Sequence, residues 1–378
     1  MLKNILFVSG TRADFGKQKQ LVEAAAANGG FNAHLLMMGM HLERRFGFTY
    51  VEGQKLHGVK VHLGKSLTED AKTDFGKCHD IVDELIREEA IDILVVHGDR
   101  LEALASSIAA LRNNVFIMHI EGGEKSGTMD ESIRHAVSKL ANLHLVANKR
   151  AAARLRQMGE DPSSIIVFGS LDIHVMKTAD LPSLDSVRSR YEIPFTSYAI
   201  VSFHPVTTDE DECLQLSSQL SNLLKFEENF IVIRSNNDLY HEYFDSIIDQ
   251  NINRENIRVF PSVRFEAFLV LLKNSKFIIG NSSSLIRESP VFGVPSFNIG
   301  TRQLGRDEFQ TPSIIHMPAN QLVSSDDINK VLSSGKCRES SSAFSEEDCI
   351  SVFNRVLEQV SKSKLANSKI FMDIDFVQ

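Results

Sequence analysis

The sequence has no tryptophan, only four cysteines and no long apolar run. The cysteines (Cys78, Cys213, Cys337 and Cys349) are scattered and lack the paired spacings that are typical of zinc sites or disulfide frameworks. A membrane-spanning helix needs about 20 consecutive apolar residues, and the N-terminal run ILFV is too short even for a signal peptide. We therefore expect a cytoplasmic protein with reduced thiols, no metal, no cofactor and no membrane partner.

Positive charge is also scarce, since 41 Lys and Arg stand against 49 Asp and Glu, for a net charge of −8 with neutral histidines. This balance argues against nucleic acid as the main partner, although a local arginine cluster can still bind an anionic ligand. A length of 378 residues with ordinary globular composition predicts two domains.

Short apolar runs alternate with stretches of helical period, as in 17–28, 75–90, 101–112, 131–142 and 149–158. The alternation predicts an α/β protein with two doubly wound, Rossmann-like domains whose parallel strands are covered by helices on both faces. The expected strands lie in 4–10, 32–39, 59–64, 92–99, 115–123, 143–148 and 165–170 of the first domain, and in 198–205, 229–236, 257–263, 277–283 and 294–300 of the second.

We assign residues 1–175 to the N-terminal domain and 176–360 to the C-terminal domain, with a linker region in 179–195. The tail, residues 345–378, is expected to be helical, and a C-terminal helix at about 360–378 is expected to pack back on the first domain. Two doubly wound domains bind ligands between the carboxyl ends of their sheets, so polar residues that directly follow strands are the candidate site residues.

Two strand ends of the first domain combine arginine and carboxylate. In SGTRADFGK, either Arg12 meets a phosphate near a helix N-terminus or Asp14 simply caps that helix. In HGDRLEAL, His97, Asp99 and Arg100 suit the rim of an active site, although Asp99 could be only a helix N-cap. Neither a G-x-G-x-x-G fingerprint nor a Walker A loop is present.

A third strand end, HIEGGEKSGTMDESIRH, is dense in carboxylates. Glu121 directly follows a buried strand, and Gly122 and Gly123 permit close backbone approach or positive φ. Asp130 stands where a helix should begin. Helix capping and a solvated charged face explain Asp130 well but Glu121 poorly. Clustered carboxylates of this kind are expected to raise the pKa of at least one of them.

The second domain offers groups that suit a nucleotide. His204 ends a strand, although a single histidine in that place is more often structural. In IIGNSSSLIRESPVFG a strand ends at Gly280, and Ser282 and Ser283 lead into an expected helix. Backbone N–H groups at that helix start, with the hydroxyls, would bind an anion, and Glu288 could accept hydrogen bonds from a ribose diol. Serine capping alone is the alternative.

Six motifs in order, GTRADFGK, HGDRLEAL, HIEGGEKSGTMDESIRH, HPVTT, GNSSSLIRE and GTRQ, resemble the hydrolysing UDP-N-acetylglucosamine 2-epimerases of bacterial sialic-acid synthesis over nearly the whole chain. The resemblance implies the two-domain GT-B fold. Where non-hydrolysing relatives carry Pro-Glu and Thr, this chain has Ala13-Asp14 and Arg100, which favours the hydrolysing branch.

The resemblance also implies a reaction, in which UDP-N-acetylglucosamine and water give N-acetylmannosamine and UDP through 2-acetamidoglucal. It implies a homodimer or homotetramer as the assembly. It assigns catalysis to Asp99, Glu121, Asp130 and His204. It assigns UDP-sugar binding to Arg12, Asp14, Arg100, Asn236, Val263, Gly280, Ser282, Ser283, Glu288 and Arg302.

Four alternatives stay open at this point. The first is the same chemistry on UDP-2,4-diacetamido-2,4,6-trideoxy-glucose, on the route to legionaminic acid. The others are a non-hydrolysing 2-epimerase, a GT-B glycosyltransferase, and a UDP-sugar sensor that binds without turnover. Around Asn236 and Asp238, Ser235 and Tyr240 stand where relatives usually carry Pro and Gly. This departure is compatible with a modified sugar.

Overall fold

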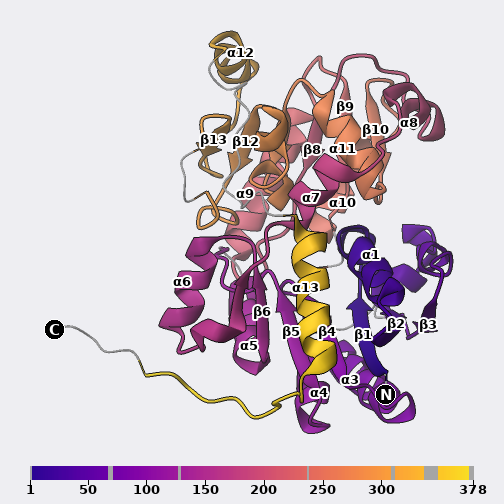
Figure 1. The fold of residues 1–378 in the computed structure, drawn as a ribbon. Helices are drawn as coiled ribbons and strands as arrows, with labels where there is room; N and C mark the ends of the chain where they lie inside the picture. The colour runs from indigo at the N-terminus through magenta and orange to yellow at the C-terminus, as the bar shows by residue number, and fades with distance from the viewer. Residues whose placement is uncertain are drawn as a thin grey trace. The chain divides into compact units, whose positions relative to one another are not determined.

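The computed structural model describes residues 2–66, 71–126, 129–235, 238–307, 311–335 and 348–373 (Figure 1). The chain divides into two compact units. The first takes in Met1–Glu124, Asp130–Lys177 and Phe344–Gln378, and the second Lys125–Met129 and Thr178–Ala343. The change of unit after Lys177 lies two positions beyond the boundary expected at residue 175. In the described part of the chain, no helix combines the length and the apolar character that crossing a bilayer requires.

The first unit contains seven parallel strands in the order β3-β2-β1-β4-β5-β6-β7. All seven expected strands are confirmed, with the bounds β1 Lys3–Ser9, β2 Phe31–Met37, β3 Val59–Leu63, β4 Ile93–His97, β5 Phe116–Ile120, β6 Leu143–Val146 and β7 Ile165–Val167. The strand order changes direction between the adjacent strands β1 and β4. The carboxyl ends at such a switch point are where doubly wound sheets bind ligands.

Helices cover both faces of this sheet, which explains why its strands are apolar throughout. On β1, Ile5 and Phe7 face one core with α1 and α13, whereas Leu6 and Val8 face the other core with α3, α4 and α5. The helices are α1 Arg12–Ala27, α2 Tyr50–Gly53, α3 Ala71–Glu88, α4 Leu101–Arg112, α5 Met129–Leu140, α6 Lys149–Gln157, α7 Leu171–Thr178 and α13 Cys349–Lys362, with short 3-10 turns at Gly39–Leu42, Arg44–Phe46 and Pro162–Ser164.

The helix that packs on the first unit from the end of the chain is α13. It lies earlier than the expected 360–378, because the buried apolar spacing that includes Phe353 stops at Val360 and the following SKSKLANSK has no apolar stripe. The described residues after the helix are extended and still belong to this unit. Lys369, for example, donates hydrogen bonds to three backbone carbonyls at the end of α5.

The second unit contains six parallel strands in the order β10-β9-β8-β11-β12-β13. Their bounds are β8 Ala199–Ser202, β9 Phe230–Ile233, β10 Ile257–Phe260, β11 Ile278–Gly280, β12 Ser296–Ile299 and β13 Ile314–Met317. The first five were expected, but β13 was missed because its apolar run is short and interrupted by a histidine. The helices are α8 Leu184–Arg190, α9 Glu210–Leu223, α10 Glu242–Asn251, α11 Phe265–Lys273 and α12 Ser325–Ser333, and α8 lies inside the expected linker.

The prediction of a helix after Gly280 is wrong. Two 3-10 turns, η4 (Ser283–Leu285) and η5 (Ser289–Phe292), occupy this stretch instead. Pro290 explains the interruption, because proline has no backbone N–H to donate and disfavours the helical conformation of the residue before it. The chain therefore has no long helix start at Ser282 and Ser283.

Candidate active site

The switch point of the first unit carries a small pocket at the ends of β1 and β4. These two strands pair in parallel, so the segments that follow them run side by side. The lining comes from both strands, from the start of α1 and from the start of α4. It consists of Val8, Gly10, Asp14, Val96, His97, Arg100, Glu102 and Ala103.

Asp14 is held in this pocket from the first turn of α1. The N-cap of the helix is Thr11, whose side-chain oxygen accepts a hydrogen bond from the backbone N–H of Asp14 at 3.2 Å. The Asp14 carboxylate is therefore not needed as a cap. One of its oxygens accepts from the N–H of Gly10 at 3.3 Å, and the other accepts from the Gln18 amide at 2.9 Å.

His97, the last residue of β4, lies between two carboxylates. Its Nδ1 is 2.7 Å from Asp14 Oδ1, and its Nε2 is 3.4 Å from Glu121 Oε1. Burial alone would lower the pKa of His97, but the charges of Glu121 and Asp14 outweigh burial and raise it to about 10. Burial would raise the pKa of Asp14, yet its hydrogen bond to His97 leaves that pKa below its ordinary value. An imidazolium thus fixes both carboxylates near neutral pH.

Glu121 follows β5 with an unusual backbone conformation. Its φ of 66° lies in the left-handed region, which a residue with a side chain adopts at a cost of about 1–3 kcal/mol. Its N–H is nevertheless bonded to the carbonyl of Leu145 at 3.0 Å. At Gly123, where φ is 76°, a Cβ atom would come within 2.4 Å of the Ala151 carbonyl oxygen, so only glycine fits. Gly123, two positions after Glu121, therefore allows the turn that directs Glu121 toward His97.

Asp99 has a cationic partner of its own, the guanidinium of Arg134 on α5. The Arg134 side chain is only 1% exposed, and it also donates to the Glu124 carbonyl at 3.0 Å. Burial would lower the pKa of Arg134, but Asp99 and the other nearby carboxylates, including Asp130, raise it. Asp130 is half-buried in the first turn of the same helix. One buried cation thus pairs with Asp99 and interacts electrostatically with Asp130.

The turn that carries Asp99 is supported from behind by His119 of β5. This fully buried ring lies 2.8 Å from the Gly98 carbonyl through Nε2 and 3.0 Å from Ser138 Oγ through Nδ1. Burial lowers the pKa of His119 to about 3, so the ring is neutral. A carbonyl can only accept, so Nε2 carries the proton and donates to Gly98. His119 therefore orients the loop that presents Asp99.

Two arginines extend the polar surface of this unit. Arg12 is the first residue of α1 and donates to the Phe46 carbonyl at 3.4 Å. Arg100, rather than Asp99, occupies the N-cap position of α4, and its Nε lies 3.3 Å from the carboxylate of Glu102. Both guanidiniums remain partly accessible, as a contact with an anionic substrate requires.

In the second unit, Asn281 organises the ends of β8 and β11. Its side chain accepts from the His204 N–H at 2.6 Å and donates to the His204 carbonyl at 2.8 Å. Its carbonyl accepts from Arg302 at 3.3 Å and from Gln303 at 3.1 Å. At Gly280, a Cβ atom would lie 1.9 Å from the Ser202 carbonyl oxygen, so the close approach of the two strands requires glycine. The buried Asn281 thus brings His204 and Arg302 together.

The GTRQ turn is also fixed by Glu212 of α9. The two carboxylate oxygens of Glu212 accept from the backbone N–H and the hydroxyl of Thr301, each at 2.5 Å. Gly300 has a φ of 84°, and a Cβ there would meet Glu212 Oε1 at 2.3 Å. A buried carboxylate on a neighbouring helix therefore sets the position of Arg302.

The remaining predicted binding residues lie in three places. Ser282 and half-buried Ser283 stand at the 3-10 turn η4, where the Ser282 hydroxyl accepts from the Ser284 N–H at 3.4 Å. Glu288 is 3% exposed just before η5. Val263 is half-buried in the loop between β10 and α11. Asn236 lies outside the described residues.

Several side chains that order the site were not among the sequence candidates. They are His119, Arg134, Glu212 and Asn281. Asn281 follows an apolar strand, which is the same signal that singled out its neighbours. In the sequence, Arg134 is notable only for its i,i+4 spacing from Asp130. Nothing in the sequence points to Glu212, which lies in an ordinary amphipathic helix.

Comparison with known proteins identifies the family of the chain. The family model described as UDP-N-acetylglucosamine 2-epimerase matches residues 23–350. The UDP-N-acetylglucosamine 2-epimerase of Neisseria meningitidis serogroup B is 39% identical over 382 residues, which cover 99% of this chain and 100% of that protein. The hydrolyzing UDP-N,N'-diacetylbacillosamine 2-epimerase of Legionella pneumophila is 30% identical over 312 residues, covering 80% and 82%.

The fold matches solved structures as well. The Methanocaldococcus jannaschii UDP-GlcNAc 2-epimerase, solved in complex with UDP-GlcNAc and UDP, gives a TM-score of 0.77 at 17% identity and covers 95% of this chain and 100% of that one. The expected pair of Rossmann-like domains in a GT-B-type fold is therefore confirmed. With the family match over most of its length, the chain belongs to the UDP-N-acetylglucosamine 2-epimerase family.

Proposed function

We propose that this family member is a hydrolysing enzyme, which converts UDP-N-acetylglucosamine and water to N-acetylmannosamine and UDP for sialic-acid biosynthesis. The observation that carries the proposal is the pair of carboxylates, Asp99 and Glu121, at the strand ends of the first unit. Each has its own cationic partner, Arg134 and His97 respectively. Side chains fixed in this way can face a neutral sugar without moving during the reaction.

The chemistry explains why carboxylates are needed. The C2 proton of the sugar has no adjacent carbonyl and is a very weak acid. Cleavage of the C1–O bond to UDP must therefore lead, because the positive charge that develops at C1 acidifies the C2 proton. A carboxylate takes this proton, and 2-acetamidoglucal and UDP result. In the second step water gives a proton to a carboxylate as its oxygen bonds to C1, and a proton is returned to C2 on the opposite face, which inverts that centre.

Asp99, Glu121 and Asp130 are the proposed proton-transfer groups. Asp99 and Asp130 share the electrostatic field of Arg134, while Glu121 is held by His97. His97 and Arg134 act as positioning residues, since each fixes the orientation of a carboxylate. The carboxylates also offset the transient positive charge of the hexose.

The leaving diphosphate needs the opposite kind of side chain. Arg302 and His204 of the second unit, joined through Asn281, are proposed to contact the pyrophosphate, together with the hydroxyls of Ser282 and Ser283. Arg12, Arg100, Gly280, Asn236 and Val263 complete the proposed nucleotide contacts. No helix start contributes at Ser282, because a 3-10 turn follows it. Hydroxyl and guanidinium donors remain suited to stabilise the departing charge.

Glu288 and Asp14 complete the proposed substrate contacts. Glu288 is buried beside the serine turn, where its carboxylate suits a ribose diol. Asp14 has its carboxylate directed at His97 in the pocket of the first unit. We therefore propose that Asp14 acts mainly by holding the imidazolium that orients Glu121.

A second candidate substrate is UDP-2,4-diacetamido-2,4,6-trideoxy-glucose. The Legionella relative, which is named for that sugar and as hydrolyzing, supports it. The higher identity to the Neisseria UDP-N-acetylglucosamine 2-epimerase supports the first candidate. Ala13 and Arg100, which depart from the non-hydrolysing pattern, support hydrolysis for either sugar.

Separate incubation with the two UDP-sugars, followed by NMR of the products, tests the proposal. We expect free N-acetylmannosamine and UDP in equal amounts from UDP-N-acetylglucosamine. Formation of UDP-N-acetylmannosamine would instead indicate a non-hydrolysing enzyme. Turnover of the diacetamido sugar alone would select the second candidate substrate. Glycosyl transfer to an added acceptor would indicate a GT-B glycosyltransferase. Binding of either UDP-sugar without turnover would indicate a UDP-sugar sensor rather than an enzyme.

A further inference from the structure

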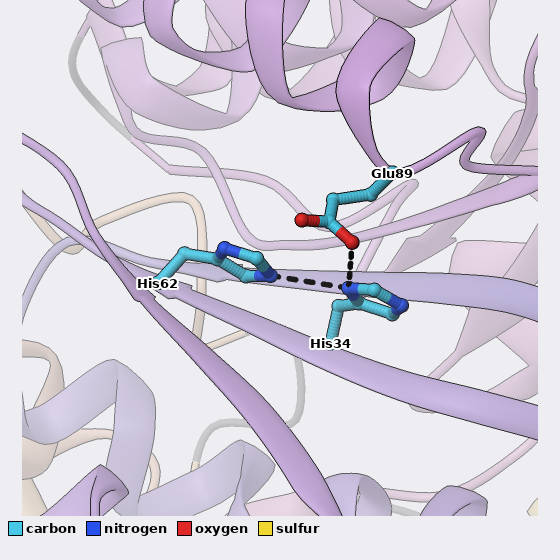
Figure 2. A group of neighbouring side chains, drawn as sticks. All are labelled: His34, His62 and Glu89. Atoms are coloured by element: carbon cyan, nitrogen blue, oxygen red, sulfur yellow. Dashed lines mark hydrogen bonds and ion pairs between the residues drawn. The ribbon is translucent and has the colours of Figure 1, made fainter.

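Two histidines and a glutamate form a cluster on the first sheet that the proposed reaction does not use. His34 lies in β2 and His62 in the edge strand β3, while Glu89 directly follows the last residue of α3. In the register of the two strands His34 is opposite Lys60, so His62 is the next side chain along the same face. Figure 2 shows the two rings and the carboxylate converging from these three elements.

The atoms that meet are suited to one small cation. His34 Nδ1 is 3.1 Å from His62 Nε2 and 3.9 Å from Glu89 Oε2, and the three ligand atoms all lie within 4.8 Å of one another. Zinc bonds of about 2.0–2.1 Å in a tetrahedron place neighbouring ligand atoms about 3.3 Å apart. The nitrogen separation already fits, and metal binding would replace the hydrogen bond between the rings, with a rotation that turns both nitrogen lone pairs toward the ion and an approach of the Glu89 carboxylate.

Burial also favours the neutral form of both histidines. Burial, followed by the proximity of His62, lowers the pKa of His34. Burial likewise lowers the pKa of His62, with Lys60 acting in the same direction against Glu89 and Glu88. Neutral imidazoles bind transition metals without first losing a proton at neutral pH.

Without a metal, other interactions engage the same atoms. A hydrogen bond joins the two histidines, and Lys60 Nζ lies 2.7 and 2.6 Å from the two oxygens of Glu89. Lys60 is 59% exposed, so its ammonium can turn to solvent at little cost when a cation takes its place. A hydrogen-bonded histidine pair beside a surface ion pair is the competing explanation of the cluster.

We propose that His34, His62 and Glu89 form a binding site for a divalent transition-metal ion, with Zn²⁺ as its ion and water in the fourth position. Two imidazole nitrogens select zinc-type ions over Mg²⁺ and Ca²⁺, which prefer oxygen ligands. The bound ion would tie the edge strand β3 to β2 and to the end of α3. It would thereby stabilise this side of the sheet.

Titration of the tag-free full-length protein, after treatment with EDTA, tests the proposal. Co²⁺ is the probe, because its tetrahedral complexes absorb visible light strongly, and Zn²⁺ then displaces it. We expect one Co²⁺ per chain. The variant His62→Gln should bind at least about 100-fold more weakly, since it removes a ligand. His57→Gln is the matched control, because His57 is an exposed histidine of the same unit outside the cluster, and it should bind like the wild type.

Lys60→Gln gives a result that a purely structural histidine pair does not predict. Removing the competing ammonium should tighten Zn²⁺ binding several-fold, and Zn²⁺ should raise the melting temperature of the wild type but not of His62→Gln. Glu89→Gln replaces His62→Gln if circular dichroism shows that the latter is misfolded. Equal binding by wild type and His62→Gln, weaker binding by Lys60→Gln, or the absence of stoichiometric Co²⁺ binding would each overturn the proposal.

Discussion

The substitution Asp99→Asn should have two separable effects, one on stability and one on catalysis. Removing one partner of a buried ion pair costs about 3–5 kcal/mol, because it leaves a charge without compensation. Asp99 is 22% exposed, and the Asn amide oxygen can still accept from Arg134, so we expect a loss of about 2 kcal/mol. The chain has no tryptophan whose fluorescence could report unfolding, so the suitable assay is hydrogen exchange of peptides from α5. This loss of about 2 kcal/mol should make hydrogen exchange through unfolding about 30-fold faster.

A double-mutant cycle separates the two effects. Arg134→Met removes the buried charge while keeping much of the side-chain volume, so Asp99→Asn/Arg134→Met should exchange more slowly than Asp99→Asn alone. Its kcat should nevertheless stay at least about 100-fold below that of the wild type, because the carboxylate is still missing. If the destabilisations of the two single variants simply add in the double variant, the reasoning about this ion pair is refuted.

Three other predictions follow from the site. Glu121→Gln and Asp130→Asn should each lower kcat at least about 100-fold while calorimetry shows UDP still binding, and near-normal turnover in both would remove the mechanism. In NMR of protein with ¹⁵N-labelled histidine, His97 should stay protonated to about pH 9, since its pKa is raised to about 10. Because its pKa is raised, protonated His97 stabilises the folded state fully below about pH 6.5, and this stabilisation is lost as pH rises through about 10. Titration of His97 near pH 6.5 would contradict the Asp14–His97–Glu121 arrangement. Glu212→Gln weakens the hydrogen bonds that the Glu212 carboxylate accepts from Thr301. It should raise the Kd for UDP about tenfold, with little change in the unfolding of the first unit. An unchanged Kd would show that this turn does not contribute to nucleotide binding.

The alternation of apolar runs predicted most of the fold, because every strand that helices cover on both faces has to be apolar. The exceptions have local causes. The run that forms β13 is short and contains His316, and the helix expected after Ser283 is interrupted by Pro290. The tail helix α13 ends where its apolar spacing ends, which places it before the expected 360–378.

The candidate site was predictable only in part. Asp99, Glu121 and Asp130 stand out because each directly follows an apolar strand or begins a helix. Their partners depend on tertiary contacts, since Arg134 reaches Asp99 across 35 positions of sequence. The sequence cluster of carboxylates suggested mutual repulsion, whereas the structure brings the imidazolium of His97 beside Glu121. Only the packing of strands and helices determines such pairings.

The fate of the C2 proton tests the central claim most directly. When the full-length protein acts on UDP-N-acetylglucosamine in D₂O, NMR should show N-acetylmannosamine with deuterium at C2 and UDP released in equal amount. This result is expected if a side chain that exchanges with solvent takes the C2 proton and another proton is returned on the opposite face. N-acetylmannosamine that keeps its original proton at C2 would contradict the account.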